Sequence, residues 1–538
     1  MKSRKIDVNL SIEAKSDKSM NNIVETAIVS AEQMSQIEEQ VFAAGMPVAA
    51  LMEKAARLCF EKIKSLYPVS NYGSVGILVG PGHNGGDALV IARELYLTGY
   101  RVKIYRPFFK LKPLTAQHAS YVASLGAAFY EEIEPLKECQ LLIDGLFGFG
   151  LTRDLPENII QAVEVINSRS QPVVSIDLPS GIHTDTGAVM GGAIRATHTL
   201  CLGLWKRAFF QDRALEYLGK SIRVDFGLLR HHIQSVLSQP VPVRQMTQAI
   251  ALDLLPLPRS VNTYKYRQGH LLLICGSRTY AGAAILTALG ARASGVGMLS
   301  IAVPESLKTL VTSQLPEALI VGCPENKEGA IASLPFSATD LTQFDLVGCG
   351  PGLTKDASSV VTKILQSECP LVLDADGLNI LSEHDVAQVL SDRSAPTVLT
   401  PHVGEFKRLF PEMTDTDDRL TTVQTAAQTS NAIILFKGAI TAIANPQGSI
   451  WLIPRSTPAL ARGGSGDILT GLTAGLATQS VKKDSSSLFD AVATAAWWHA
   501  TAAIAAARER TELGVDGVTL AQYLTPTLDK LLNNVSSD

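Results

Sequence analysis

The run Gly463-Gly464-Ser465-Gly466-Asp467 stands directly before ILTGLTAGLAT (468–478), a sequence that favours a helix. Glycines in such a turn let successive backbone N–H groups converge on a bound anion, and the start of a helix adds partial positive charge. A carboxylate held beside that anion can take a proton from an attacking hydroxyl. The run therefore indicates phosphate chemistry, with Asp467 as the candidate base.

Short apolar runs on the N-terminal side of this turn predict a parallel sheet. They lie at 271–274, 346–349, 371–373, 397–399 and 433–436. A cluster of Gly, Asp, His or Lys follows almost every one of them. Because α/β sheets bind ligands at the carboxyl ends of their strands, we expect these clusters to share one site.

Several polar residues in these clusters are candidate ligands. Lys437 could contact nucleotide phosphates, and Asp374 and Asp376 could either bind Mg²⁺ or form a turn. His402, taken alone, is more often a structural histidine, and Glu405 lies beside it at the same strand end. The chain has no GxxxxGK[ST] run, so any nucleotide site here is not a P-loop.

A second glycine-rich turn, GPGHNGGD (80–87), separates a predicted strand at 75–79 from a predicted helix at 88–99. It contains the dinucleotide-binding pattern G-x-G-x-x-G, but the following strand ends at Tyr105 without the usual acidic residue. Asp87 would also repel a pyrophosphate. An ordinary NAD-dependent dehydrogenase is therefore disfavoured, as is a turn kept only for packing. We expect the turn to hold a polar ligand, with or without a cation.

Two more predicted strands, 141–143 and 173–176, end at Asp144 and Asp177. Either aspartate alone would more often cap a loop or helix. Together with Asp87 they place three carboxylates at strand ends of one sheet, where each raises the pKa of the others unless a cation intervenes. The pattern predicts a general acid/base site or a metal site.

Composition limits the class of protein and its partners. The chain has 538 residues, a net charge of -4 and no basic stripe interleaved with aromatic residues, which argues against nucleic acid as a partner. Its seven scattered cysteines form no CxxC pair, as in a cytoplasmic protein with reduced thiols. The apolar run 491–507 is too short and too rich in Ala for a membrane span, so we expect a buried helix and no membrane partner.

The βα pattern is interrupted between about 228 and 267, where prolines are scattered through polar sequence. We therefore predict an α/β protein with an N-terminal Rossmann-like three-layer α/β/α domain followed by a second α/β domain. The predicted segments are a disordered tail at 1–21, a first domain at 22–231, a linker at 232–260 and a second domain at 261–538.

Multiple ordered motifs resemble known families. The first domain resembles the NAD(P)H-hydrate epimerases through GPGHNGGD, DGLFGFGLTRD and SIDLPSG. The second resembles the ribokinase-like NAD(P)H-hydrate dehydratases through GSRTYAGAA, GCGPGLT, LDADGLN, LTPHVGEF, FKGAIT and ARGGSGD. Both in this order look like the bifunctional bacterial NAD(P)H-hydrate repair enzymes. Departures are mild, such as HNGGDA (83–88) where the family often has NNGGDG.

The resemblance implies two reactions. The first domain would interconvert the R and S epimers of NAD(P)HX, which is NAD(P)H hydrated at C6 of its ring. The second would dehydrate the S epimer at the expense of ADP and with Mg²⁺. It also implies K⁺ in the first domain, and we expect a cytoplasmic homo-oligomer.

The resemblance further implies the site residues. In the first domain, K⁺ would be held by Asn84, Asp144 and Ser180, and Asp177 would be catalytic. Two turns would line the hydrate pocket. The first consists of His83, Asn84, Gly85, Gly86 and Asp87, and the second of Gly148, Phe149, Gly150, Leu151, Thr152, Arg153 and Asp154. In the second domain Asp467 would be the base, and the hydrate would contact Ala283, Gly352 and His402. The nucleotide would contact Lys437, Gly438, Ala439, Ile440, Thr441 and Gly466.

Two other functional hypotheses remain open. A ribokinase-like small-molecule kinase fused to a nucleotide-binding domain would use the same glycine-rich turn on an alcohol, and a stable phosphorylated product would identify it. Alternatively, the first domain is a binding module that has lost its activity. Intact Asn84, Asp144 and Asp177 count against the second reading.

Overall fold

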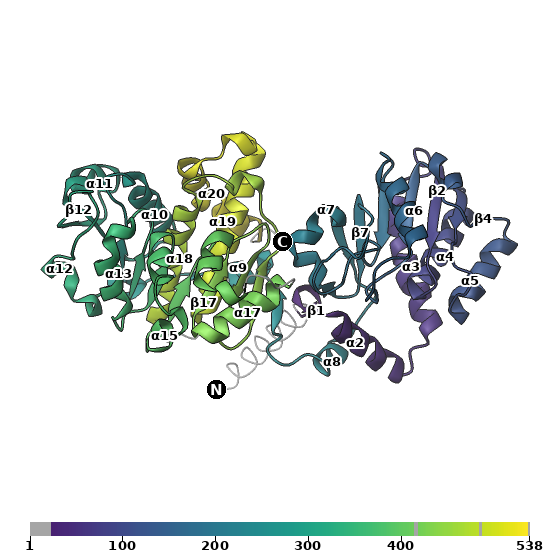
Figure 1. Cartoon of the computed structure of the whole chain (residues 1–538), viewed down its shortest axis with the longest axis horizontal. Helices are drawn as coiled ribbons and strands as arrows, with labels where there is room; N and C mark the ends of the chain where they lie inside the picture. Colours follow the sequence, from purple (N-terminus) through teal and green to yellow (C-terminus); the bar gives the residue numbers. More distant parts are fainter. Residues whose placement is uncertain (1–22, 414–417, 484–486, 536–538) are drawn as a thin grey trace, which may run out of the picture. The chain divides into compact units, whose positions relative to one another are not determined.

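The computed structural model describes residues 23–413, 418–483 and 487–535, so the predicted tail at 1–21 lies outside the described residues. The chain divides into two compact units, 1–243 and 244–538 (Figure 1). Each unit is built on its own mostly or wholly parallel sheet with helices packed against it. The predicted α/β class is therefore confirmed.

The first unit contains a seven-stranded parallel sheet in the order β4-β3-β2-β5-β6-β7-β9. Its strands are β2 (Ser74–Val79), β3 (Arg101–Tyr105), β4 (Ala128–Tyr130), β5 (Leu141–Gly145), β6 (Val173–Ile176), β7 (His198–Leu202) and β9 (Lys220–Val224). The chain runs outward from β2 to β4 and then returns to place β5 on the other side of β2. This reversal is the switch point at which doubly wound sheets bind ligands.

Helices cover both faces of this sheet. On one face, Val75, Ile77 and Val79 pack in a cluster that includes α3 (Val48–Leu66), α4 (His83–Leu97) and α5 (Pro113–Ser124). On the other, Leu78 and Leu142 pack with α6 (Glu157–Asn167). Alternate strand residues point to opposite faces, so each strand is buried twice. The predicted three-layer arrangement is confirmed.

A smaller element closes the first unit. Strand β1 (Ile28–Val29) pairs in parallel with β8 (Trp205–Lys206), and Val29 lies opposite Lys206. Helix α2 (Ala31–Ala43) follows β1 after Ser30, whose side chain caps the helix. Segments far apart in the sequence thus meet at the pair β1–β8.

The second unit contains a ten-stranded sheet in the order β10-β19-β18-β17-β16-β15-β14-β11-β12-β13. Its strands are β10 (Val243–Gln245), β11 (His270–Ile274), β12 (Met298–Pro304), β13 (Leu319–Cys323), β14 (Leu346–Cys349), β15 (Leu371–Leu373), β16 (Thr397–Leu399), β17 (Ile433–Phe436), β18 (Thr441–Ala444) and β19 (Ile450–Ile453). Strands β11 to β17 are parallel, whereas β18 pairs antiparallel with both neighbours. The switch point lies between β11 and β14.

One large apolar cluster holds the helices of this unit against the sheet. Its helices are α9 (Gln248–Leu254), α10 (Ala281–Ala293), α18 (Ser465–Lys483), α19 (Leu488–Arg510) and α20 (Gly517–Val535). Two glycines let α10 and α18 approach closely. A methyl group on Gly471 would lie 1.7 Å from the Thr287 carbonyl oxygen, and one on Gly290 would lie 2.2 Å from that of Ile468.

The remaining helices are shorter connections. They are α7 (Leu215–Leu218), α8 (Arg230–Gln234), α11 (Lys308–Gln314), α12 (Phe336–Thr339), α13 (Ser358–Leu365), α14 (Asp376–Leu381), α15 (Val386–Ser391), α16 (Val403–Leu409) and α17 (Arg419–Ser430). The predicted linker at 232–260 contains β10 and α9, which belong to the sheet and core of the second unit. The run predicted as a buried helix at 491–507 is part of α19. Within the described ranges, no helix is long and apolar enough to span a bilayer.

Candidate active sites

In the first unit, close backbone packing fixes the turn after β2. A methyl group on Gly85 would lie 2.0 Å from the Gly80 carbonyl oxygen. One on Gly80 would lie 1.6 Å from the Leu146 carbonyl oxygen. Only glycine leaves room for these contacts. The turn after β5 is therefore held against the start of α4, at the switch point of the sheet.

Asp144, the fourth residue of β5, is fully buried. Its Oδ1 accepts a hydrogen bond from the Ser180 hydroxyl (2.6 Å), and its Oδ2 accepts from the Ser180 N–H (2.9 Å) and the Ser175 hydroxyl (2.8 Å). Burial raises the pKa of Asp144, and these hydrogen bonds oppose the rise. The structure thus brings the predicted ligands Asp144 and Ser180 together.

Asn84 and Asp177 meet at the neighbouring turn. A methyl group on Gly148 would lie 3.1 Å from Asp177 Oδ2 and 3.3 Å from Asn84 Cγ. Asp177 adopts a φ of 67°, unusual for a residue with a side chain, and its Oδ2 accepts the N–H of Phe149 at 3.0 Å. The Asn84 amide nitrogen is buried without a hydrogen-bond partner in the described protein.

The other predicted residues of this pocket differ in exposure. Gly85, Gly86, Asp87 and Leu151 are buried. Exposed side chains belong to His83, Thr152, Arg153 and Asp154, and Gly150 is also exposed. Burial raises the pKa of Asp87 well above its usual value, and the charges of Asp177 and Glu38 raise it further.

Sequence reasoning missed Lys206 and Glu38. The Lys206 ammonium is fully buried and lies 2.5 Å from Asp177 Oδ1. Burial raises the pKa of Glu38 to about 7, against the opposing effect of Lys206. A signal was present in the sequence, because Lys206 follows an apolar run, CLGLW (201–205), in which a charged side chain is costly to bury.

In the second unit, Lys437 lies at the centre of the predicted nucleotide site. Its Nζ is 2.9 Å from Asp374 Oδ1 and 3.8 Å from Glu405 Oε2. A methyl group on Gly466 would lie 3.8 Å from the same atom. The strand ends of β15 and β17 and the start of α18 therefore converge on one ammonium group.

Asp467 lies in the first turn of α18. Burial raises its pKa to about 6, the charge of Asp374 raises it further, and the Lys437 ammonium lowers it. A carboxyl group with a pKa near neutrality is suited to act as a general base. The role of Asp467 as the base stays a prediction.

Asp374 makes two side-chain contacts that the sequence did not predict. Besides its contact with Lys437, its Oδ2 accepts a hydrogen bond from the Thr470 hydroxyl at 2.5 Å. Burial alone would raise the pKa of Asp374, but Lys437 and Thr470 lower it overall. Asp376 instead accepts the N–H of Thr354 and organises a turn. In the part of the chain that the structure describes, no group of three or more His, Cys, Asp and Glu residues could hold a metal ion.

Three residues predicted to contact the hydrate have clear positions. A methyl group on Gly352 would lie 2.7 Å from the Cβ of Ala283, so these two residues touch at the switch point. His402 caps α16, with its Nδ1 accepting the N–H of Gly404 at 2.9 Å. Its ring is more than half exposed. His402 is thus a structural histidine that still presents a surface to a ligand.

His499 contacts the glycine-rich turn at 463–467. Its Nε2 lies 2.9 Å from the carbonyl oxygen of Ser465. Burial lowers the pKa of His499 to about 4, so the ring is neutral near pH 7 and can donate to that oxygen. This residue lies in α19.

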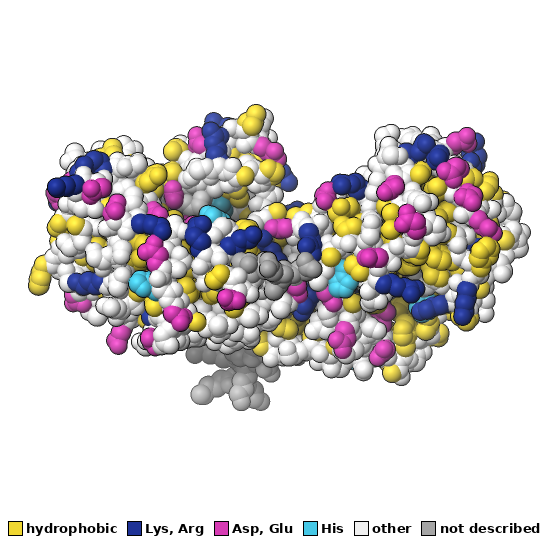
Figure 2. All heavy atoms as spheres, in the orientation of Figure 1, with side chains coloured by type: hydrophobic (Ala, Val, Ile, Leu, Met, Phe, Trp, Pro, Cys, Tyr) yellow, Lys and Arg dark blue, Asp and Glu magenta, His cyan; other side chains and the backbone are white. Residues whose placement is uncertain are grey.

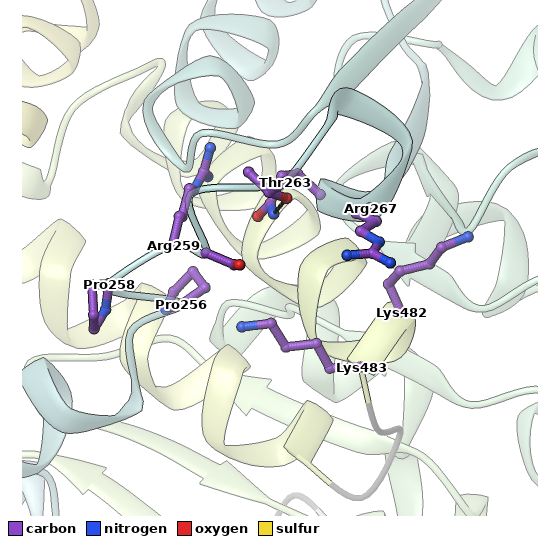
Figure 3. A pocket seen from close by; sticks show the side chains of 9 residues that line it. Pro256, Pro258, Arg259, Thr263, Arg267, Lys482 and Lys483 are labelled. Atoms are coloured by element: carbon purple, nitrogen blue, oxygen red, sulfur yellow. Dashed lines mark hydrogen bonds between the residues drawn. The ribbon is translucent and has the colours of Figure 1, made fainter.

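The second unit also has a basic cavity of about 470 Å³, shown in Figure 3. Its cationic side chains are Arg259, Arg267, Lys482 and Lys483, and it is lined by none of the predicted site residues. Elsewhere, on the face shown in Figure 2, positive and negative side chains are interspersed over both units.

Both halves of the chain match known protein families. Residues 271–526 match the NAD(P)H-hydrate dehydratase family, and residues 48–208 match the family described as YjeF-related protein N-terminus. The second unit is similar to a Bacillus subtilis ADP/ATP-dependent NAD(P)H-hydrate dehydratase that was co-crystallised with ATP and Mg²⁺. That similarity has 28% identity and a TM-score of 0.44, and it covers 53% of this chain and 97% of the other.

Two relatives span nearly the whole chain, and both are named bifunctional NAD(P)H-hydrate repair enzymes. The protein from Synechocystis sp. is 54% identical over 93% of this chain and 94% of its own length. The protein from Thermosynechococcus vestitus is 50% identical over 94% of this chain and 98% of its own length. The chain therefore belongs to the family of bifunctional NAD(P)H-hydrate repair enzymes.

Proposed function

We propose that this chain performs both reactions of its family: it epimerises R- and S-NAD(P)HX and dehydrates the S epimer to NAD(P)H, converting ADP to AMP and phosphate. The main support is the position of Asp467, a carboxyl group with a pKa of about 6 at the start of α18 and close to Lys437. A base, an ammonium group and a helix start are what transfer of a phosphoryl group to a hydroxyl requires.

Dehydration then proceeds in two steps. Hydroxide is a poor leaving group, so the C6 hydroxyl is first phosphorylated. Asp467 takes the proton of this hydroxyl while the hydroxyl oxygen attacks the terminal phosphorus of ADP and releases AMP. The lone pair of the ring nitrogen next expels phosphate, and loss of a ring proton restores NAD(P)H. Lys437, held by Asp374, neutralises charge on the transferred group. Mg²⁺ would bind with the ADP phosphates and neutralise their charge.

Epimerisation can proceed when the lone pair of the ring nitrogen expels the protonated C6 hydroxyl as water and water then adds to the opposite face of the resulting iminium ion. The carboxyl group of Asp177 would exchange the proton with that oxygen. The side-chain oxygens of Asn84, Asp144 and Ser180 would be the ligands of K⁺, which prefers oxygen donors. A cation bound there would stabilise the negative charge of the buried Asp144.

The predicted contacts of both substrates, the domain boundaries at 22–231 and 261–538, the homo-oligomer and the cytoplasmic location are part of this proposal. The experiment is chromatographic. The purified chain is incubated with mixed R- and S-NADHX, ADP, Mg²⁺ and K⁺, and both epimers, NADH and AMP are followed. We expect both epimers to disappear with one NADH and one AMP formed for each. Consumption of S alone beyond the uncatalysed rate would refute the epimerase activity.

A small-molecule kinase remains the alternative for the second unit. It would leave a stable phosphorylated product, whereas the repair reaction releases inorganic phosphate. Phosphorus NMR of the same mixture distinguishes the two. A persistent phosphate ester with no NADH formed would favour the kinase.

A further inference from the structure

The Lys206–Asp177 pair is the most completely buried ion pair among the residues that the structure describes. The side chains of Lys206 and Asp177 are 1% and 4% exposed. Lys206 Nζ donates to Asp177 Oδ1 at 2.5 Å and also to the carbonyl oxygen of Leu202. It lies 5.7 Å from the centre of the Phe149 ring. A buried ammonium group is costly, so its contacts need a reason beyond packing.

The contacts of Lys206 fix one oxygen of Asp177 and leave the other for the turn at 148–150. Oδ1 accepts from Lys206 and from the N–H of Leu202 at 3.3 Å. Oδ2 accepts from the N–H of Phe149 and would lie 3.1 Å from a methyl group on Gly148. Without the ammonium group, nothing described would hold Oδ1 except one long N–H contact.

The strand pair β1–β8 brings a second carboxyl group to the same place. Val29 pairs with Lys206, and α2, which begins two residues later, carries Glu38. Lys206 lowers the pKa of Glu38 and Asp177 raises it, so the three groups interact. The titratable groups that act on this pair from the surrounding helices and strands are Glu38 on α2, Cys59 on α3, Asp87 on α4 and Cys201 on β7.

We propose that Lys206 is the positioning residue of the epimerase site: it holds the carboxylate of Asp177 in place and directs Oδ2 toward the hydrate. This inference rests on the function proposed above for Asp177. Lys206 itself touches no reacting atom. It acts by fixing a catalytic group whose displacement by about 1 Å can cost roughly 10²-fold in rate.

The test uses the full-length chain and R-NADHX as substrate. Lys206→Met removes the charge at similar length, and Lys206→Gln removes the charge but keeps an N–H donor. We expect kcat for the R epimer to fall by about 10²-fold in both, with KM changed much less. Wild-type kcat in a folded variant would overturn the proposal.

Controls separate a positioning role from a structural one. Denaturant unfolding of the full-length variant reports whether it folds, and dehydration of the S epimer reports the second unit. Lys103→Met removes a more exposed ammonium group of the first unit, one that pairs with Glu138, and should leave kcat unchanged. Asp177→Asn should abolish epimerisation, and adding Lys206→Met to it should change the rate no further. Independent losses from the two changes would overturn the proposal.

These variants also separate this inference from the proposed function. If Asp177→Asn is as active as the wild type, the role of Asp177 fails whatever Lys206 does. If Asp177→Asn is inactive and Lys206→Met is fully active, only the positioning role of Lys206 fails.

Discussion

Asp467 shows how burial prepares a single residue for chemistry. Its raised pKa of about 6 means that a substantial fraction is protonated, and inactive as a base, in mildly acidic solution. We therefore predict that kcat/KM for dehydration of S-NADHX rises about tenfold per pH unit below pH 6 and levels off above it. Steady-state rates at saturating ADP check this. A rate that is constant from pH 5 to 8 would contradict the role of Asp467.

Asp467→Asn keeps the shape of the side chain and removes the base. We predict that dehydration falls by roughly 10²–10⁴-fold, the usual contribution of a general base, while epimerisation is unchanged. Asp392→Asn, at an exposed residue of the same unit, is the matched control and should keep full activity. Equal dehydration by the Asp467 variant and the control would remove Asp467 from the mechanism.

At the scale of elements, the contact between α10 and α18 positions Asp467. A methyl group on Gly471 would collide with the Thr287 carbonyl oxygen at 1.7 Å. We predict that Gly471→Ala lowers the free energy of unfolding by about 1–3 kcal/mol or more and also slows dehydration, because α18 must shift. Denaturant unfolding followed by tryptophan fluorescence measures it. Gly282→Ala is the control: Gly282 lies in α10 with open space around it, so this change should not destabilise the unit.

The sequence predicted those elements whose signal is local. The apolar runs at 271–274 and 173–176 coincide with β11 and β6 almost to the residue, since strands buried on both faces are continuously apolar. Strand β10 and helix α9 were predicted as linker because prolines surround them. The pairing of Lys206 with Asp177 joins two residues that are 29 positions apart, and no local pattern encodes such a contact.

The same reasoning applies to the sites. Glycine-rich turns and strand-end carboxylates could be found because a switch point gathers them. The structure places Asn84, Gly148 and Asp177 together, as the motifs suggested. Asp374 and Lys437 could be named as candidates for the site of Asp467, but their direct contact and its effect on the pKa of Asp467 could not be predicted, because side-chain distances depend on the folded geometry.

At the scale of the whole molecule, the two sites lie in separate compact units. Conditions that change the activity of one site should therefore leave the activity of the other unchanged. We predict that replacing K⁺ with tetramethylammonium slows consumption of R-NADHX and leaves dehydration of S-NADHX unchanged, because the oxygen ligands proposed for K⁺ are in the first unit. Rates on each purified epimer check this, and equal slowing of both would contradict a K⁺ site confined to that unit.

The most direct test of two reactions in one chain is the rate of NADH formation by Asp177→Ala from each purified epimer, with ADP and Mg²⁺. We predict that the S epimer is converted at the wild-type rate, since Asp467 and Lys437 are untouched. The R epimer should give NADH only as fast as it epimerises without catalysis. Wild-type rates from both epimers would contradict the account, because epimerisation would then not depend on Asp177.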